Sequence, residues 1–351
     1  MTMEFETIEL PREVLVKQKA IDSTGKICRL LRLEGPCLLF TNSNLMEIAG
    51  RDVFRNLNSS GYVVNTEMID GVEKKRMDEL VDKARKYSFI VAVGGGKVID
   101  AAKYASFKVG VPFISIPTAP SHDGIASPRA TLNTDDGKKI SYEARTPIAV
   151  IADLNVIAKA PYRLIASGFG DTIANIIAIA DWRLAQKEIG ETVSEYSCNL
   201  SLTCAENVMK FADSIKNREI TGIKVLVDAL LSSGMAMCIT KNSRPASGSE
   251  HLFSHAIDYL YPETPATHGE QVGLGTLIMA KLHEMDWQKF KEIMQVVGLP
   301  TNAEQIKIPE EILIKSLAYA KEIRKDRYTI LNKLDLSESK AKEILKEVNV
   351  I

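Results

Sequence analysis

The stretch that decides the fold is Val93-Gly94-Gly95-Gly96-Lys97-Val98-Ile99-Asp100, which joins an apolar run to a helical pattern. Three consecutive glycines let the backbone turn tightly and approach a ligand with no Cβ atom in the way. The helix that follows presents free N–H groups and the positive end of its dipole, which favour a phosphate. The stretch matches neither GxGxxG nor the P-loop pattern. We nevertheless predict that a phosphate or pyrophosphate group binds at residues 94–100.

Short apolar runs lie on both sides of this turn and alternate with helical patterns. Strands are predicted at residues 36–40, 62–64, 89–93, 113–116 and 148–152, and helices at 44–49, 75–87 and 98–107. Uniformly apolar strands separated by helices are typical of a parallel sheet that is covered on both faces. Residues 1–158 are therefore predicted to form a Rossmann-like α/β domain that binds a dinucleotide.

The strand signal fades after Pro161, where apolar residues recur with a period of about 3.6. Helices are predicted at 171–186, 202–211, 223–237, 250–260, 272–285, 289–297 and 309–323. Residues 159–351 are therefore predicted to form an all-α domain that binds metal and substrate. We expect the active site in the cleft between the two domains.

Composition limits the classes of protein that remain. The 351 residues carry 44 basic and 45 acidic side chains, and this balance argues against a nucleic-acid-binding protein. The acidic start is unlike a signal peptide, and no apolar run reaches the ~18 residues of a membrane span. Five scattered cysteines without CxxC spacing favour a reducing compartment. We expect a cytoplasmic protein that does not insert into a membrane.

A second candidate loop, Thr118-Ala119-Pro120-Ser121-His122-Asp123-Gly124, follows the strand predicted at 113–116. Open α/β sheets bind ligands at the carboxyl ends of their strands. Small residues here, and Ser127 shortly after, suit close contact with a dinucleotide, whereas Asp123 suits a polar substrate. The alternative is a proline-stiffened loop whose Asp and Ser side chains cap turns.

The end of the first predicted strand bears on the choice of dinucleotide. NAD-selective sites usually hold the ribose 2′-hydroxyl with a carboxylate, which repels the 2′-phosphate of NADP. Here the sequence reads Phe40-Thr41-Asn42-Ser43 and contains no carboxylate. We therefore expect NADP to be tolerated.

Histidines mark a candidate metal site. His251 and His255 are four residues apart on a predicted helix and so share one face, and His268 follows shortly after. Neutral imidazoles suit zinc and neighbouring metals, and the alternative is two surface histidines and one loop histidine. Asp171 precedes an apolar helical pattern, so by itself it indicates an N-cap. Of the other two histidines, we expect His122 to line the Thr118–Gly124 loop and His283 to be structural.

Taken in order, five segments resemble the sn-glycerol-1-phosphate dehydrogenase family. They are Gly94-Gly-Gly-Lys-Val-Ile-Asp100, Pro117-Thr-Ala-Pro-Ser-His-Asp-Gly124, Gly168-Phe-Gly-Asp171, Ser249-Glu-His-Leu-Phe-Ser-His255 and His268-Gly-Glu-Gln-Val-Gly-Leu-Gly275. That family belongs with dehydroquinate synthases, glycerol dehydrogenases and iron-type alcohol dehydrogenases. The resemblance implies reversible reduction of dihydroxyacetone phosphate to sn-glycerol 1-phosphate by NAD(P)H. The product is the backbone of archaeal membrane phospholipids.

The resemblance also implies roles for individual residues. It makes Asp171, His251 and His268 the ligands of one Zn²⁺ per subunit, and it places Asp123 and His255 against the substrate. By the same resemblance, the cofactor contacts are Gly94 to Asp100, Thr118, Ala119, Pro120, Ser121 and Ser127. The sequence alone leaves open whether the proton passes through His255, Asp123 or a metal-bound water, and whether the chain is a homo-oligomer.

One position departs from the wider superfamily. Iron-type alcohol dehydrogenases carry a histidine four residues after the ligating aspartate, where this chain has Asn175. Three protein ligands leave an open coordination position, as catalytic zinc requires. Arg244, just before the His251 helix, is a candidate for the substrate phosphate.

The same sequence features are compatible with several other functions. The alternatives are a polyol dehydrogenase acting on glycerol, a nickel-dependent bacterial-type glycerol-1-phosphate dehydrogenase, and, less well matched, a dehydroquinate synthase. From another class, a nucleotide sensor without catalysis would have no reason to keep the aspartate and histidine set.

Overall fold

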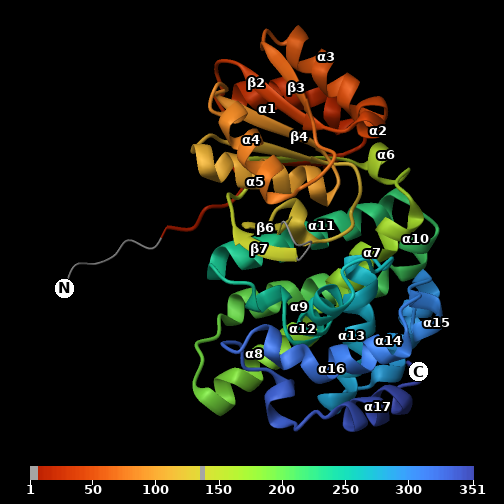
Figure 1. The fold of residues 1–351 in the computed structure, drawn as a ribbon. Helices are drawn as coiled ribbons and strands as arrows, with labels where there is room; N and C mark the ends of the chain where they lie inside the picture. Colours follow the sequence, from red (N-terminus) through yellow and green to blue (C-terminus); the bar gives the residue numbers. More distant parts are fainter. Residues whose placement is uncertain (1–6, 135–138) are drawn as a thin grey trace.

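A six-stranded parallel sheet forms the upper part of the protein in Figure 1, and helices form the rest. The computed structural model describes residues 7–134 and 139–351. The strands follow the order β1-β8-β5-β4-β2-β3. Their bounds are β1 (Glu13–Lys17), β2 (Cys37–Thr41), β3 (Val64–Met68), β4 (Phe89–Gly94), β5 (Phe113–Pro117) and β8 (Ala149–Asp153). The predicted parallel sheet is therefore confirmed.

Both faces of the sheet are covered, as its apolar strands predicted. Strand β4 is buried along its whole length. Its Ile90 and Ala92 side chains belong to one hydrophobic cluster, which includes residues of α4 and α5. Phe89, Val91 and Val93 point the other way into a cluster shared with α1 and α3. Alternate side chains of one strand thus enter two cores.

The helices of the sheet half connect its strands or follow the last one. They are α1 (Thr24–Leu30), α2 (Ser43–Leu45), α3 (Arg51–Ser59), α4 (Lys74–Ala84), α5 (Gly96–Val109) and α6 (Leu154–Ile157). A π-helical segment, Met46–Gly50, joins α2 to α3. The helical stretch predicted at 44–49 is therefore longer than expected, because it continues through the π-helical segment and α3 as far as Ser59.

Every element described beyond Asp153 is helical. The longer helices are α7 (Tyr162–Ile173), α8 (Asn175–Ile189), α9 (Glu195–Lys210), α11 (Ile220–Thr240), α12 (Ser249–Leu260), α13 (His268–Leu282), α14 (Trp287–Val297), α16 (Glu310–Ile323) and α17 (Glu338–Glu347). The shorter ones are α10 (Ala212–Lys216) and α15 (Ala303–Ile306). The predicted sequence of an α/β part followed by a helical part is confirmed.

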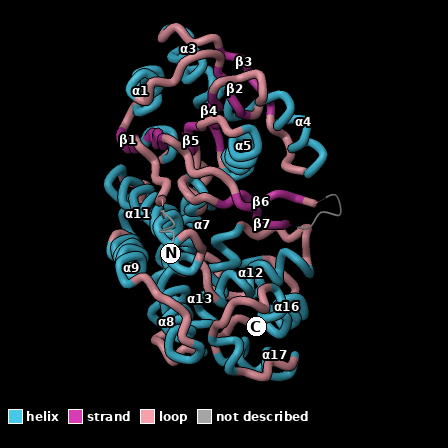
Figure 2. Tube along the Cα trace, turned by 90° about the vertical axis from the view of Figure 1, so that its left-hand side faces the viewer, coloured by secondary structure: helices cyan, strands magenta, loops and turns pink. Residues whose placement is uncertain are grey.

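Sequence reasoning missed three strands. Strand β1 pairs with β8 at one edge of the sheet, and its side chains are only partly covered. Strands β6 (Arg129–Asn133) and β7 (Lys139–Glu143) form an antiparallel pair that lies between the sheet and the helices (Figure 2). These strands mix polar and apolar residues, so a search for uniformly apolar runs did not find them.

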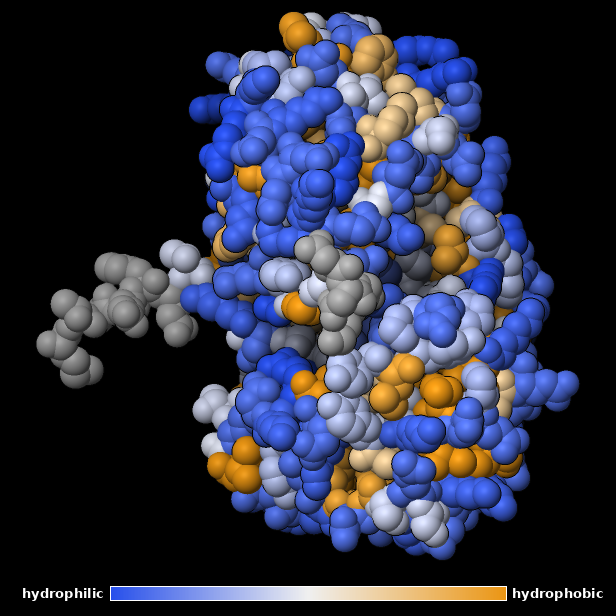
Figure 3. Space-filling model, viewed as in Figure 1, coloured by the Kyte–Doolittle hydropathy of each residue, from blue (hydrophilic) through white to orange (hydrophobic). Residues whose placement is uncertain are grey.

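Two helical stretches, Tyr162–Ile189 and Ile220–Thr240, are long and apolar enough to cross a membrane. In the first, 83% of the most apolar window is buried inside the protein, and in the second 67%. Core helices give the same pattern. The face seen in Figure 3 is mostly hydrophilic, with small hydrophobic groups scattered over it.

The two candidate cofactor loops leave the sheet side by side. Gly94 ends β4 opposite Pro117, which ends β5. The backbone N–H of Thr118 donates to the Gly94 carbonyl at 3.0 Å. The glycine turn and the Thr118–Gly124 loop therefore share one edge of the sheet, where open α/β sheets bind ligands.

Candidate metal centre and active site

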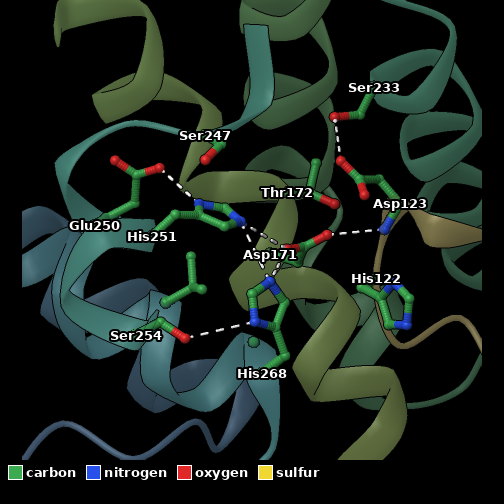
Figure 4. A network of polar contacts seen from close by, with 12 residues as sticks. His122, Asp123, Asp171, Thr172, Ser233, Ser247, Glu250, His251, Ser254 and His268 are labelled. Carbon is green, nitrogen blue, oxygen red and sulfur yellow. Dashed lines mark hydrogen bonds and ion pairs between the residues drawn. The ribbon is translucent and has the colours of Figure 1, made fainter. Parts of the chain in front are cut away.

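Asp171, His251 and His268 come together although they lie on three different helices (Figure 4). One ligand atom of each lies within 4.8 Å of the other two. Asp171 Oδ1 is 3.7 Å from His251 Nε2 and 3.4 Å from His268 Nε2. The two Nε2 atoms are 3.2 Å apart. The three side chains offer one carboxylate and two imidazoles to a single point.

Small residues bring the backbones of α7 and α13 close enough for this arrangement. A Cβ atom at Gly269 would overlap the Ser167 carbonyl, and one at Gly170 would overlap the Gly269 carbonyl. Ser167 Oγ also accepts the Gly269 N–H at 3.1 Å. Because no side chains separate the helices here, Asp171 on α7 reaches His268 at the start of α13.

Hydrogen bonds to the outer atoms fix how each side chain faces the centre. Glu250 Oε1 accepts from His251 Nδ1 at 2.7 Å. Ser254 Oγ donates to Gln271 Oε1 at 2.6 Å, so it is free to accept from His268 Nδ1 at 3.5 Å. With a proton on each Nδ1, both Nε2 atoms face the centre, where an Nε2 that carries no proton can offer its lone pair to a metal.

Asp171 is held in the same way. Its Oδ2 accepts the backbone N–H of Asp123 at 2.9 Å, which leaves Oδ1 toward the two histidines. A carboxylate and two imidazole lone pairs repel one another unless a proton or a cation lies between them. One carboxylate with two imidazoles is a donor set that suits zinc and neighbouring divalent metals. The residues present therefore fit a metal ion.

Asp171 is not the helix N-cap that its local sequence indicated. It lies inside α7, two residues before the last residue of that helix, and its side chain is 4% exposed. Burial opposes its ionisation, but the hydrogen bonds and charges of His251 and His268 outweigh burial and lower its pKa well below the usual range. The same contacts, together with Glu250, raise the pKa of His251 to about 10 against the effect of burial. The aspartate is ionised, and the positive charge of His251 stabilises it.

The Thr118–Gly124 loop brings Asp123 and His122 to this centre from the sheet half. Asp123 Oδ2 accepts from Ser233 Oγ of α11 at 3.5 Å. Burial and the negative charge of Asp171 raise the pKa of Asp123 to about 8. The His122 ring lies between the glycine turn, where a Cβ at Gly96 would overlap it, and His268, 6.2 Å away between ring centroids. His122 thus does line the loop, as expected.

His255 lies near the metal candidates but outside their group. Its ring centroid is 6.2 Å from that of His251 and 6.3 Å from that of His268. Burial is the main cause that holds its pKa well below the usual value. A neutral imidazole beside the centre can contact a substrate and exchange hydrogen bonds with it.

The glycine turn offers mainly backbone groups to a cofactor. Gly95 and Gly96 are half-buried, and Lys97 is exposed. Val98 and Ile99 are buried in the core, so only their N–H groups can face a ligand. Asp100 Oδ2 accepts the Thr131 N–H at 3.1 Å, and therefore ties α5 to β6.

On the second loop, Thr118, Ala119 and Pro120 are buried and Ser121 is half-buried. Ser127 is 2% exposed, and its hydroxyl accepts from Lys103 Nζ at 3.3 Å. Lys103 is itself fully buried behind the turn. Any cofactor contact at Ser127 would therefore compete with, or add to, this hydrogen bond.

Asn175 does not join the metal candidates. Its side-chain amide donates to Ser233 Oγ at 3.2 Å, and it is fully buried. Through Ser233 it supports Asp123. The position that carries a histidine in iron-type enzymes here belongs to the hydrogen-bond network around the loop.

Sequence reasoning missed the residues that orient the ligands. Glu250, Ser254 and Gln271 had no assigned role, although Glu250 directly precedes His251 and Ser254 lies on the same helix. Their role in orienting His251 and His268 is seen only in the structure, where their buried side chains contact these two rings directly or through Ser254. Their adjacency to candidate ligands was the one available signal.

The comparisons identify the chain as a dehydrogenase, the class that a parallel sheet with two candidate cofactor loops beside a candidate metal centre favours. Residues 15–161 match the iron-containing alcohol dehydrogenase family. The chain is 44% identical to a glycerol-1-phosphate dehydrogenase [NAD(P)+] of Thermococcus kodakarensis, over 100% of both chains. It is 45% identical to that of Pyrococcus furiosus, over 98% of this chain and 99% of the relative. The chain therefore belongs to the glycerol-1-phosphate dehydrogenase family.

Solved structures show the same fold at low sequence identity. A glycerol dehydrogenase from Schizosaccharomyces pombe superposes with a TM-score of 0.83 at 20% identity, covering 99% of this chain and 91% of that one. A sulfoacetaldehyde reductase from Bifidobacterium kashiwanohense, solved in complex with NAD+, gives 0.75 at 16% identity, covering 98% and 99%.

Proposed function

We propose that the protein reduces dihydroxyacetone phosphate to sn-glycerol 1-phosphate reversibly, with NAD(P)H as hydride donor and Zn²⁺ held by Asp171, His251 and His268. The observation that carries the proposal is the meeting of these three side chains beside the loop of Asp123. Two relatives, each 44% identical to this chain, are named glycerol-1-phosphate dehydrogenase [NAD(P)+], which supports the reaction class.

Each part of the site has a task in this reaction. The bound zinc would act as a Lewis acid that polarises the C2 carbonyl. Asp123 and His255 would contact the substrate and fix which face of C2 receives the hydride, and either can exchange a proton with the C2 oxygen. Glu250 and Ser254 would hold the histidine rings in place.

The cofactor would lie along the edge where β4 and β5 end. Residues 94–100 would hold its pyrophosphate through backbone N–H groups at the start of α5, and Thr118, Ala119, Pro120, Ser121 and Ser127 would line the other side. Hydride transfer is the chemistry of the nicotinamide, and the protein supplies orientation.

This activity would supply the glycerophosphate backbone of archaeal phospholipids from the cytoplasm. The substrate is a small molecule, and nothing in the proposal requires a nucleic acid or membrane insertion.

A chiral product assay tests the proposal. Zinc-loaded protein, NADPH and dihydroxyacetone phosphate should yield only the sn-1 enantiomer. The sn-3 enantiomer, or no reduction, would overturn it. Reduction of dihydroxyacetone in preference to its phosphate would indicate a polyol dehydrogenase. Full activity with nickel and none with zinc would instead identify the nickel-dependent type.

A further inference from the structure

Three arginines lie close together in the helical half. Arg324 and Arg327 follow α16, and Arg244 lies in the segment before α12, against which Arg327 packs. Arg244 forms a two-pronged ion pair with Glu191, in which Nε donates at 2.7 Å. Arg324 pairs with Asp326 at 2.8 Å. The third arginine, Arg327, forms no ion pair with any carboxylate in the described part of the chain.

Arg327 is instead held by neutral oxygens. Nη1 donates to the Ser247 carbonyl, and Nη2 donates to Ser243 Oγ at 2.8 Å. Its side chain is nonetheless buried, with 5% of the residue exposed. Burial, with Arg324 and Arg244 next to it, lowers the pKa of Arg327 to about 9, so it remains charged near neutral pH.

A buried cation is costly unless an anion accompanies it. Glu250 and Asp326 stabilise the charge of Arg327 from a distance but do not contact it. A guanidinium has five N–H donors, and the two hydrogen bonds described leave three of them for a ligand. Such a group suits the oxygens of a phosphate, which it can bind with two parallel hydrogen bonds.

Arg327 packs against the segment that leads into α12, the helix that carries His251 and His255. It holds Ser247, which is four residues before His251 and precedes the start of α12. Its charge also acts on His255 on the same helix, as does that of Lys139 from β7. Lys139, however, is paired with Asp258 at 2.7 Å. Of these two cations near His255, Arg327 alone lacks a carboxylate in contact.

We propose that Arg327 anchors the phosphate group of the substrate, and so makes the enzyme select a phosphorylated ketone over the free polyol. This inference rests on the proposed function, because it takes the substrate to bind between the metal candidates and His255. Arg244, the candidate from sequence, is unsuited to the task because Glu191 and the Tyr328 carbonyl occupy its guanidinium.

The test compares two ketones that differ only in the phosphate. Steady-state rates are measured with dihydroxyacetone phosphate and with dihydroxyacetone, for the wild type, Arg327→Met and Arg327→Lys. We expect Arg327→Met to lower kcat/KM for the phosphate ester roughly 10- to 100-fold, because a charged hydrogen-bonded anchor is lost. Its kcat/KM for dihydroxyacetone should stay within about twofold of the wild type, and Arg327→Lys should recover part of the loss.

A second readout uses inorganic phosphate as a competitive inhibitor, whose inhibition constant should rise in Arg327→Met by a similar factor. Lys325→Met is the matched control, because Lys325 is exposed and pairs with Glu322 on the surface. Zinc content and thermal unfolding of each variant show whether the fold is retained. Should Arg327→Met unfold, the two-ketone comparison and phosphate inhibition measured on Arg327→Lys still decide.

Equal losses for both ketones, or unchanged inhibition by phosphate, would overturn the role of Arg327. A wild type that shows no preference for the phosphate ester would contradict the proposed function itself. The wild-type comparison therefore tests the proposed function first, and the variants then test Arg327 separately.

Discussion

Glu250 and His251 are consecutive residues whose side chains bind each other: Glu250 Oε1 accepts from His251 Nδ1 at 2.7 Å. The same oxygen accepts the Gly248 N–H at 2.7 Å, and Glu250 is fully buried. Carboxylates in this position orient the imidazole and make its other nitrogen a better ligand. The relationship leads to the first prediction.

Glu250→Gln should weaken zinc binding roughly 10- to 100-fold, because a neutral amide orients the ring but no longer increases its basicity. Competition with a chromophoric chelator measures the affinity, and the visible spectrum of the cobalt-substituted protein reports the ligand geometry. Glu292→Gln, an exposed change on α14, is the control. An affinity equal to that of the wild type would show that Glu250 has no influence on the metal.

His251→Ala should remove bound zinc and activity together, because two ligands rarely retain zinc at a catalytic site. His283→Ala provides the contrast, because among the described residues His283 Nε2 pairs with Asp181 Oδ1 at 2.9 Å and with none of the three metal candidates. That variant should lose stability but keep one zinc per subunit by atomic absorption. Normal metal content in His251→Ala would contradict the ligand assignment.

Zinc should compete with protons at this site. The pKa of His251 is raised to about 10 in the protein without metal, so near pH 7.5 its imidazole is protonated and must lose a proton to bind zinc. The apparent affinity should therefore rise with pH, up to about tenfold per unit, and level off near pH 10. Asp171 is already ionised and releases none.

Calorimetry in two buffers of different ionisation enthalpy measures the protons released. About one proton per zinc at pH 7.5 is the expected result. Zinc binding without any proton release would mean that His251 is neutral before the metal arrives.

Asn42→Asp should shift cofactor preference toward NADH. Asn42 follows β2 beside the glycine turn and caps α2, with Oδ1 accepting the Leu45 N–H at 2.9 Å. Aspartate can keep this cap while adding the carboxylate that repels a 2′-phosphate. We expect the ratio of kcat/KM for NADPH over NADH to fall roughly tenfold. An unchanged ratio would show that the adenosine ribose of the cofactor does not bind beside residue 42.

Arg244→Met should destabilise the protein without altering substrate preference. Arg244 is buried and paired with Glu191, and removal of one partner of such a pair costs about 3 kcal/mol. Urea unfolding measures the loss, whereas the relative activity on dihydroxyacetone phosphate and dihydroxyacetone should match the wild type. A selective loss with the phosphate ester would return Arg244 to the role that its sequence position suggested.

Local patterns were sufficient for much of this fold. Strand β4 and the glycine turn could be predicted because an apolar run followed by Gly94 to Gly96 has few other solutions. Strand β6 could not, because its alternation of buried and exposed residues is short and its partner β7 is mostly exposed. Asp171 looked like a cap, since nothing local shows that α7 begins at Tyr162.

Some residues of the candidate site could likewise be predicted from the sequence, and others could not. His251 and His255 could be placed on one helical face by their spacing alone. Arg327, by contrast, is far along the chain from both, and its importance comes from what it lacks, a carboxylate in contact. That property exists only in three dimensions, after Glu191 and Asp326 have been assigned to other arginines.

The hydrogen bond from the Asp123 amide to Asp171 Oδ2 crosses from the sheet half to the helical half. A cation bound to Asp171 withdraws electron density from its carboxylate, and this changes the strength of the hydrogen bond that the carboxylate accepts from the Asp123 amide. Metal binding and the order of the Thr118–Gly124 segment are therefore thermodynamically linked. Amide hydrogen exchange at Asp123 would then record the filling of a site to which its own side chain is not bound.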